Sequence, residues 1–438
     1  MQKSTSPLQQ HCRKVLVLGD DDRMVLPIVR SLARQGIEVH LGWCQQGDPT
    51  ARSRYVNRHH ELPWPSASKH HWLISLNTLV ETEKFDLVIP ATEQAMFALQ
   101  THCEELAARD RFYLLRHDTF ESVTDKRATY VLCEELQIPY PQTVSLHDAD
   151  DFERAAPALG EAIIVKPTCS VNSNGEPGKA FVQCCSSIAQ ARKYVTYLME
   201  QGCAVDLQRH VAGEGVGVEL IAREGKILAA LQHRRLHETV GHGSTYRETV
   251  ELDPRLLNAC ERLMEALSYT GVAMVEFRVD PDSGEWALLE VNGRFWGSLP
   301  LATAAGMDFP LFLYQMLVEG QTKFQQEYQV GVRSRALARD VRWLWRRAAC
   351  RFRANSVSHG DDMGWTPNLR PWRRVLFDTL RGFCGLDHID TFAWDDPGPT
   401  AGELARFVSD ALVSLRSRLP KPSVQWLQTR RLLQAQHV

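Results

Sequence analysis

The chain has 438 residues, 44% of them hydrophobic and 24% charged, and a formal net charge of −3. This length exceeds what one hydrophobic core usually organises, so we expect roughly two to four domains, and no stretch approaches the ~18 consecutive apolar residues of a membrane span. The 11 cysteines are scattered without a Cys-x-x-Cys pair. That argues against a disulfide framework or a structural zinc site and favours a cytoplasmic location.

Short apolar strands and helical patterns alternate along residues 14–118. Strands are predicted at 15–18, 37–41, 87–89 and 112–114, and helices at 22–35, 70–84 and 93–108. This β-α alternation predicts an α/β domain with a parallel sheet covered by helices. Its first turn has one glycine followed by three acids, which would repel a pyrophosphate. The pattern therefore excludes a nicotinamide or flavin dehydrogenase.

Acidic side chains follow two of these strands. Asp20, Asp21 and Asp22 follow the first strand, and Glu93 follows the third. Because the carboxyl ends of parallel strands line a crevice, these carboxylates are candidates to receive a substrate ammonium group. The alternative is that Asp22 or Thr92 only caps the helix that begins there.

A second unit, with strands and helices in a different order, is predicted over residues 119–320. Helices at 126–137 and 187–201 interleave with strands at 162–166, 180–183, 204–208, 216–222 and 226–233, and a hairpin closes the set. Sequential strands joined by short turns indicate antiparallel sheets flanked by helices, which is an α+β arrangement.

Residues 331–438, after a polar linker at 321–330, form a mainly helical C-terminal region that is rich in Arg and Trp. Helices are predicted at 341–352, 371–383 and 402–419, and the region has 18 Lys and Arg against 10 Asp and Glu. We expect the basic stems to pair with the acidic remainder of the chain. Five tryptophans are expected to pack these helices against the body: Trp343, Trp345, Trp365, Trp372 and Trp394.

The hairpin near residue 280 carries the most informative side chains. Its two strands hold one carboxylate each, Glu276 and Glu290, and Asn292 lies two residues after the second. Period-two geometry places Glu290 and Asn292 on one face of their strand, with Glu276 nearly opposite Glu290. Three oxygen ligands on one sheet face suit Mg²⁺. Arg294, at the strand end, can grip a phosphate bidentately.

Two lysines and a polar loop are candidates for phosphate binding. Lys126 begins a helix, and Lys166 ends a buried strand, where its ammonium group is directed into a cleft. Taken singly, a lysine in such a position is more often a solvated surface residue. The loop at 168–179 is built of small polar residues, including Ser173 and Gly175, and such a loop can donate backbone N–H groups to phosphates.

An extended stretch after the strand at 204–208 is a candidate for base recognition. It consists of Gln208, Arg209, His210 and Val211. Its backbone edge can hydrogen-bond an adenine, and the carboxylate of Glu214 can bind ribose hydroxyls.

Taken in this order, these residues resemble the ATP-grasp superfamily over about residues 15–320. The resemblance implies a Rossmann-like domain at 14–118 followed by a two-lobed ATP-grasp domain at 119–320. The small lobe would cover about 125–208 and the large lobe about 209–320. The cofactors implied are ATP and Mg²⁺, with Mn²⁺ as a substitute.

The resemblance also assigns roles to single residues. Lys126 and Lys166 would bind the α- and β-phosphates, under the loop at 168–179. Residues 208–211 would hold adenine, although Gln208 stands where the family commonly has a glutamate. The amide oxygen of Gln208 can still accept from the adenine amino group. The metal ligands would be Glu276, Glu290 and Asn292, and Arg294 would steady the transferred phosphoryl group.

The branch that the chain resembles is that of the carboxylate–amine ligases. Such enzymes activate a small-molecule carboxylate as an acylphosphate and join it to an amine, releasing ADP. Arg234 and Arg235 are the candidates to face the substrate carboxylate, and only one of two adjacent strand residues can point inward. No nucleophilic side chain is required for this chemistry.

Two other interpretations stay open. One is a carboxylase-type ATP-grasp enzyme, although no Met-Lys-Met biotin attachment site is present. The other is a regulatory or interaction protein that binds ATP as a ligand, against which the complete metal set counts. Partners are expected to be small molecules rather than membranes or nucleic acids, and a homodimer is an open alternative.

Overall fold

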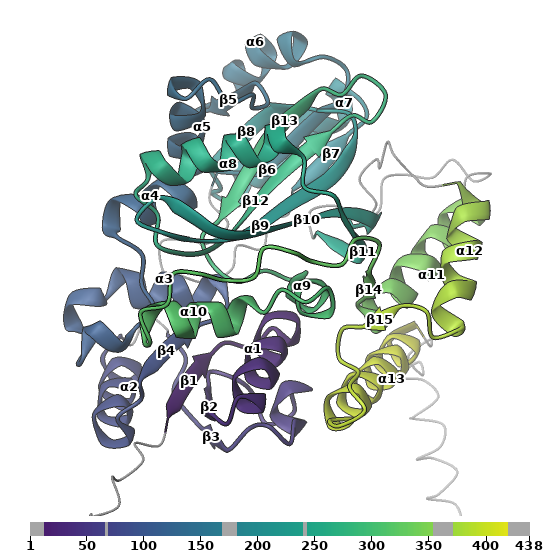
Figure 1. The fold of residues 1–438 in the computed structure, drawn as a ribbon. Helices are drawn as coiled ribbons and strands as arrows, with labels where there is room; N and C mark the ends of the chain where they lie inside the picture. The colour runs from purple at the N-terminus through teal and green to yellow at the C-terminus, as the bar shows by residue number, and fades with distance from the viewer. Residues whose placement is uncertain (1–12, 66–68, 169–181, 240–242, 354–370, 419–438) are drawn as a thin grey trace, which may run out of the picture.

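The computed structural model describes residues 13–65, 69–168, 182–239, 243–353 and 371–418, whose strands form three sheets (Figure 1). The first sheet is parallel, in the order β3-β2-β1-β4. Its strands are β1 (Lys14–Leu18), β2 (Glu38–Gly42), β3 (Arg58–His60) and β4 (Leu87–Pro90), and helices α1 (Asp22–Arg34), α2 (Lys69–Glu83) and α3 (Glu93–Thr101) alternate with them. We call this unit the N-terminal sheet.

Two predicted elements of the N-terminal sheet are shorter than expected. The strand predicted at 112–114 is a single bridge between Val88 and Phe112. The helix predicted at 93–108 ends at Thr101, because a 3₁₀ turn follows and Ala108 has a φ of 50°. A residue in the left-handed region cannot continue a right-handed helix.

The second sheet, here the small sheet, is antiparallel in the order β5-β8-β6-β7. It comprises β5 (Thr143–Leu146), β6 (Ile163–Pro167), β7 (Gln183–Cys185) and β8 (Val205–Arg209), with helices α6 (Ala149–Leu159) and α7 (Ile188–Glu200). Alternating strand residues such as Ile163 and Val165 are fully buried against these helices in a core of their own. Their neighbours at alternate positions are therefore directed to the opposite face.

The third sheet, here the large sheet, has seven strands in the order β13-β12-β9-β10-β11-β14-β15. The first five are β9 (Glu214–Arg223), β10 (Lys226–Glu238), β11 (Ser244–Val250), β12 (Gly271–Val279) and β13 (Trp286–Asn292), all antiparallel to their neighbours. Helices α4 (His117–Thr124), α5 (Lys126–Glu135), α8 (Pro254–Ala266), α9 (Leu299–Ala304) and α10 (Phe309–Leu317) complete this part of the chain.

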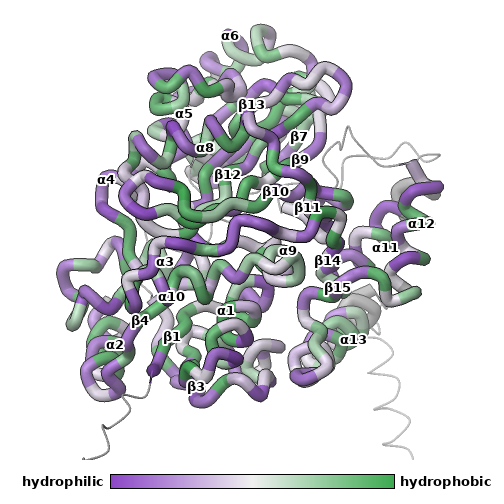
Figure 2. Tube along the Cα trace, viewed as in Figure 1, coloured by the Kyte–Doolittle hydropathy of each residue, from purple (hydrophilic) through white to green (hydrophobic). Residues whose placement is uncertain are grey.

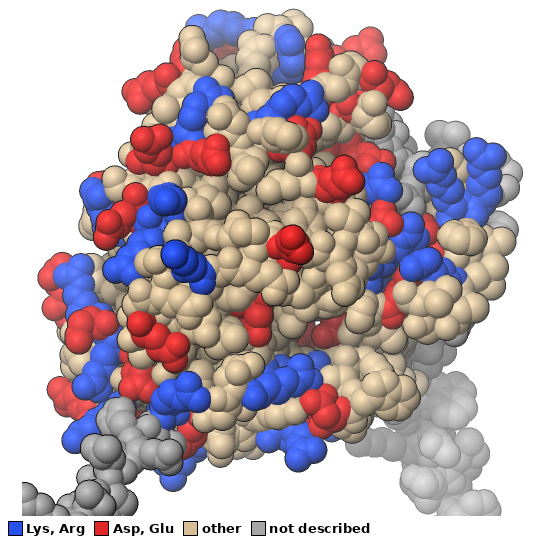
Figure 3. All heavy atoms as spheres, viewed as in Figure 1, with Lys and Arg blue, Asp and Glu red and all other residues tan. Residues whose placement is uncertain are grey.

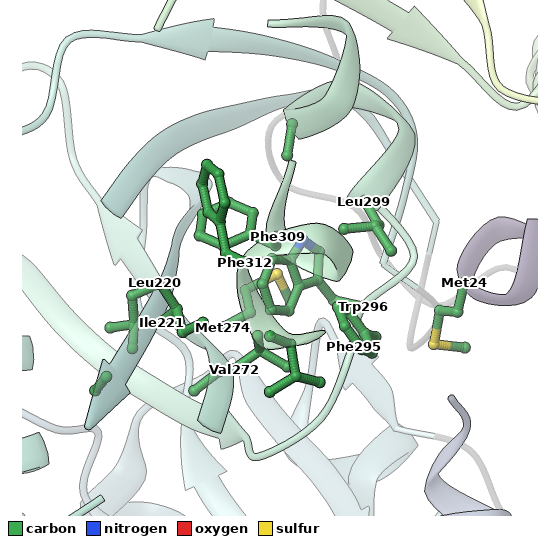
Figure 4. Close-up of a cluster of buried hydrophobic side chains, with 14 of the residues drawn as sticks. Met24, Leu220, Ile221, Val272, Met274, Phe295, Trp296, Leu299, Phe309 and Phe312 are labelled. Atoms are coloured by element: carbon green, nitrogen blue, oxygen red, sulfur yellow. The ribbon is translucent and has the colours of Figure 1, made fainter. Parts of the chain in front are cut away.

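A buried apolar cluster joins the large sheet to the helices beneath it. Trp296, Phe309 and Phe312 pack against sheet residues such as Val272 and Leu220, as the close-up shows (Figure 4). Helix α10 is hydrophobic along its length (Figure 2), because it lies between the large sheet and α1. A helix that is apolar all round is expected only where both sides are covered.

The C-terminal region contributes to the large sheet as well as forming helices. Strands β14 (Arg333–Arg335) and β15 (His388–Ile389) extend that sheet beyond residue 320, and helices α11 (Leu337–Arg353), α12 (Trp372–Phe383) and α13 (Gly398–Arg418) follow around them. On the face drawn in Figure 3, basic and acidic side chains are interspersed over the body. Within the described ranges, no helix combines the length with the apolar content that a bilayer crossing requires.

A short segment at 390–396 ties the large sheet to the N-terminal sheet. Asp390 pairs with Arg247 of β11 at 2.7 Å, and both side chains are buried. Six residues later, Asp396 pairs with Arg30 of α1 at 2.9 Å and accepts from Ser53. We call residues 390–396 the strap.

The tryptophans of the C-terminal region do not behave alike. Trp343 stacks on the buried His237 of β10 with 3.9 Å between ring centroids, as packing against the body requires. Trp345 and Trp394 are 59% and 89% exposed, so the expectation that they pack against the body is wrong. Trp365 lies outside the described residues.

Candidate functional site

A cleft of about 630 Å³ opens where the three sheets meet. Asp20 lines it from the end of β1, Lys166 from the small sheet and Glu276 from the large sheet. Eleven of the predicted site residues lie along this cleft: Lys126, Lys166, Gln208, Arg209, His210, Val211, Arg235, Glu276, Glu290, Asn292 and Arg294. The structure therefore brings together residues that are up to 168 positions apart in the sequence.

Two of the predicted residues that the structure describes, Arg234 and Glu214, do not line the cleft. Ser173 and Gly175 lie outside the described residues. Glu214 begins β9 and lies 3.9 Å from Arg234 across an ion pair. Both side chains are 39% exposed.

The candidate metal ligands meet on the β12–β13 hairpin as predicted. Glu276 is directly opposite Glu290, and Asn292 is opposite Met274. The amide Nδ2 of Asn292 lies 3.2 Å from Oε1 of Glu276 and 3.4 Å from Oε1 of Glu290. Turning this amide by 180° presents its oxygen to the same two carboxylates.

The second oxygen of each carboxylate is held by a cation. Oε2 of Glu276 pairs with Arg235 at 2.5 Å, and Oε2 of Glu290 pairs with Lys126 at 3.4 Å. Both Oε1 atoms are thereby turned toward Asn292. Two carboxylate oxygens and one amide oxygen make a hard donor set that fits Mg²⁺. In the described part of the chain no cluster of three His, Cys, Asp or Glu side chains offers an alternative metal site.

The charges around this hairpin keep the carboxylate of Glu290 ionised. Burial opposes ionisation of Glu290, but the surrounding cations, Lys126 foremost, hold its pKa at about 2. Burial likewise disfavours the charged form of Lys126, and Glu290 outweighs it, so the pKa of Lys126 is raised. A carboxylate that stays ionised at neutral pH is a ready ligand for a divalent cation.

Adjacent arginines on β10 point to opposite faces of the large sheet, which decides between the two candidates. Arg235 faces the cleft and reaches Glu276. Arg234 pairs with Glu248 of β11 at 2.7 Å. The alternation is that of any strand, and it leaves Arg235 as the arginine that can act in the cleft.

Two glycines of β9 make room for this arrangement. A Cβ at Gly215 would lie 2.7 Å from Cδ of Arg235, and a Cβ at Gly217 would lie 2.4 Å from the ring of His233. The side chains of β10 therefore lie flat across β9, and Arg235 reaches a carboxylate on β12. Any side chain at these two positions would block that path.

Lys166, Tyr130 and Gln208 form a buried network at the small sheet. The hydroxyl of Tyr130 accepts from Nζ of Lys166 at 3.1 Å and from Nε2 of Gln208 at 2.8 Å, and it donates to the carbonyl of Leu289 at 2.7 Å. Burial, together with the neighbouring Lys126, lowers the pKa of Lys166 to about 7. An anion bound here would restore the full charge of Lys166.

The same network fixes the orientation of the Gln208 amide. Its Nε2 also donates to Oγ1 of Thr143 at 2.8 Å, and that hydroxyl donates its own proton to the carbonyl of Pro141. Since both hydroxyl protons are committed, the group facing them must be the NH₂ of Gln208. The amide oxygen of Gln208 is therefore the atom left to accept a hydrogen bond.

The backbone of residues 208–211 is used in two ways. Gln208 and Arg209 are paired with β6 and belong to the sheet. His210 and Val211 follow the end of β8 and line the cleft. The backbone edge expected over four residues is therefore confined to the last two.

Arg294 lies in the cleft with its guanidinium bound to Glu93 of α3 at 2.9 Å. Glu93, which was predicted to bind a substrate ammonium group, is thus paired with an arginine. Asp21 caps α1 and binds Arg23 through two hydrogen bonds, and Asp20 is exposed at the end of the cleft. The helix-cap alternative holds for Thr92, which caps α3, whereas on α1 the cap is Asp21 rather than Asp22.

The turn after Arg294 is held by residues that no sequence motif singled out. Arg247 donates to the carbonyl of Gly297 at 3.1 Å, and Ser298 donates to the buried Glu219 at 2.6 Å. Glu219 also lies 3.1 Å from His233. The sequence could have indicated Glu219, because glycines at alternate positions of β9 precede it and mark the face of the strand that lies under the cleft.

A family model matches this part of the chain. Residues 205–339 fit the family described as ATP-grasp in the biosynthetic pathway with Ter operon. The matched residues include β9 to β13 and therefore the Glu276, Glu290 and Asn292 trio.

Curated relatives match over part of their length. The chain is 31% identical over 215 residues to D-alanine–D-alanine ligase of Methylococcus capsulatus, covering 44% of this chain and 65% of that protein. It is 27% identical over 179 residues to formate-dependent phosphoribosylglycinamide formyltransferase of Pasteurella multocida, covering 39% of this chain and 41% of that protein. The chain thus spans less than two thirds of the length of these relatives.

Solved structures share the fold at low identity. An L-amino acid ligase from Bacillus licheniformis superposes with a TM-score of 0.56 at 16% identity, over 71% of this chain and 77% of that one. Biotin carboxylase from Campylobacter jejuni superposes with a TM-score of 0.58 at 14% identity, over 73% and 74%. These likenesses concern the fold.

Proposed function

Because this chain belongs to the ATP-grasp superfamily, we propose that it is an ADP-forming ligase that activates a small-molecule carboxylate as an acylphosphate and joins it to an amine. ATP and Mg²⁺ are the cofactors of this superfamily. The observation that carries the proposal is the convergence of Glu276, Glu290 and Asn292 beside the cations that hold their outer oxygens.

Adenine would bind at the end of β8. The free amide oxygen of Gln208 would accept from the exocyclic amino group, and the backbone of His210 and Val211 would contact the base edge. The committed protons of Tyr130 and Thr143 support this role, because they turn the acceptor of Gln208 away from the network. Glu214 is not needed for this interaction, and ribose recognition by it would require movement of its side chain.

The phosphates would lie between the small and large sheets. Lys126 and Lys166 both line this part of the cleft and would neutralise the α- and β-phosphates. Mg²⁺, held by Glu276, Glu290 and Asn292, would supply charge neutralisation at the phosphate oxygens. Arg294 would release Glu93 or share it while steadying the transferred phosphoryl group.

The reaction has two steps. In both, the side chains of the cleft position the substrates and neutralise their charges, and none of them acts as a nucleophile. A carboxylate oxygen attacks the γ-phosphorus, the bond to the β-bridging oxygen breaks, and ADP leaves. The amine nitrogen then attacks the acyl carbon, the C–O bond to phosphate breaks with its electron pair, and the amine proton passes to phosphate or solvent. Arg235 would stabilise the oxyanion that develops in the second step.

The decisive experiment is ADP release from ATP and Mg²⁺ against pools of amino acids and small carboxylic acids, beside a Glu290→Ala control. We expect release that requires an acid and an amine together and that disappears in the control. Release with bicarbonate alone would identify the carboxylase-type alternative. ATP binding without release in any pool would identify the binding-protein alternative and refute the ligase.

A further inference from the structure

Beyond Arg294, toward the N-terminal sheet, apolar side chains contribute to the lining of the cleft. Its lining there includes four apolar side chains: Met24, Met96, Phe97 and Phe120. They come from α1, α3 and α4, so that three separate helices supply one apolar surface. We call these four residues the apolar subsite.

The apolar subsite borders the reaction centre directly. Sδ of Met24 lies 4.0 Å from Nη1 of Arg294. On the other side, a Cβ at Gly293 would lie 2.8 Å from Val123 and 3.0 Å from Leu115, so the strand end that carries the metal ligands rests on the apolar wall behind Phe120. A carboxylate that receives a phosphoryl group held by Arg294 would therefore lie close to this surface.

The rings of Phe97 and Phe120 are the accessible part of the subsite. Both are only partly buried, and their centroids are 6.0 Å apart with a 52° angle between the planes. Met24 and Met96, which also line the cleft, are 7% and 3% exposed. Inclined aromatic rings and flexible thioethers accept apolar groups of varied shape.

The four side chains of the subsite offer no charged partner to a substrate group placed among them. Of the charged residues that line the cleft nearby, Glu93 is bound to Arg294, and Asp21 and Arg23 are bound to each other. Asp20 lies two residues after the end of β1. Burying a charge without a partner is strongly unfavourable. The lining therefore discriminates by polarity as well as by size.

We propose that the carboxylate substrate bears an apolar group, branched aliphatic or aromatic, close to its carboxylate, and that Phe97 and Phe120 determine this specificity. The proposal rests on the proposed function, in which Arg294 steadies the phosphoryl group that is transferred to the carboxylate. It adds the class of acid that the site accepts.

The test is a calorimetric titration of the full-length protein saturated with Mg²⁺ and a non-hydrolysable ATP analogue. The probes are leucine, phenylalanine, and their counterparts without the amino group, 4-methylpentanoate and 3-phenylpropanoate. Aspartate and lysine are the polar comparisons. We expect apolar probes to bind at least about 10-fold more tightly than the polar ones, since each buried methylene contributes roughly fourfold.

Substitutions distinguish a loss of substrate specificity from a loss of folding. Phe97→Ser is expected to weaken the apolar probes about 10-fold while the affinity for the ATP analogue is unchanged. Phe377→Ser removes an equivalent ring that is 61% exposed on α12 and should change neither affinity. Phe97→Leu, which keeps an apolar contact, should recover most of the lost binding.

Failure of this proposal is distinguishable from failure of the ligase reaction. Equal binding of aspartate and leucine, no binding of any apolar probe, or a Phe97→Ser variant with wild-type affinity would each overturn the apolar subsite. Tight binding of apolar acids without ADP release from ATP would refute the ligase reaction and support the subsite.

Discussion

Replacing Arg235 by methionine should abolish most of the acid-dependent ADP release. Methionine keeps much of the length of the side chain and removes its charge. The guanidinium is buried to 12% exposure and forms the ion pair that orients Glu276. Burial disfavours its charged form, but Glu276 and Glu238 outweigh this and raise the pKa of Arg235, so a full positive charge is lost at every accessible pH.

The size of the effect follows from the position of this charge. Two unit charges about 4 Å apart interact by about 4 kcal/mol at an effective dielectric constant of about 20. Removal of one donor that stabilises developing charge typically costs about 2.7–4 kcal/mol, which is roughly 10²- to 10³-fold in rate. We therefore expect the rate of Arg235→Met to fall by about 10²- to 10³-fold.

The neighbouring residue provides the matched control. Arg234→Met removes the same charge one residue away, on the other face of β10, where Arg333 remains to bind Glu248. Its rate should stay within about threefold of wild type, because an ion pair outside the cleft does not contact the reacting groups. The assay couples ADP release to NADH oxidation with the acid and amine pools. An Arg235→Met enzyme within about fivefold of wild type, or equal losses in both variants, would refute the reasoning.

Three further outcomes are expected. Because the pKa of Lys166 is lowered to about 7, the lysine should take up a proton when Mg·ADP binds at pH 8. Calorimetric titrations in buffers of different ionisation enthalpy measure this proton uptake. A binding enthalpy that does not depend on the buffer would contradict a phosphate-binding role. Asp396→Ala should lower the free energy of unfolding by about 3–5 kcal/mol, whereas Asp395→Ala, at an exposed position, should lower it by no more than about 1 kcal/mol. Urea denaturation measures both values, and equal losses would exclude a buried strap contact. Gly217→Ala should cost about 1–3 kcal/mol because its methyl group meets the ring of His233, and a wild-type midpoint would show that the ring is free to move.

The hairpin that carries the candidate metal ligands could be predicted from the sequence because it is local. Glu276, Glu290 and Asn292 lie within 17 residues, and strand alternation alone places them on one face. The parallel N-terminal sheet could be predicted for the same reason, since its strands are short apolar runs with helices between them. The residues also indicated candidates for phosphate and base binding, but the assignment of each candidate to a particular phosphate or to adenine depended on the resemblance to a family.

What could not be predicted depends on contacts between distant segments. Alternation shows that Arg234 and Arg235 point to opposite faces, but only the position of β9 and β12 decides which face is the cleft. Strands β14 and β15 have three and two residues, too few for any periodicity to appear. The pairing of Arg247 with Asp390 joins residues 143 positions apart, and neither residue stands in a motif.

The strap also constrains the order in which parts of the protein can fold during synthesis. Arg30 and Arg247 are synthesised well before their buried partners, Asp396 and Asp390. Until those two aspartates have left the ribosome, two guanidinium groups destined for the interior lack the counter-ions that the folded protein gives them. The N-terminal sheet and strands β9 to β13 of the large sheet can form beforehand, but the cleft between the two sheets acquires its final geometry only after residue 396 has been made.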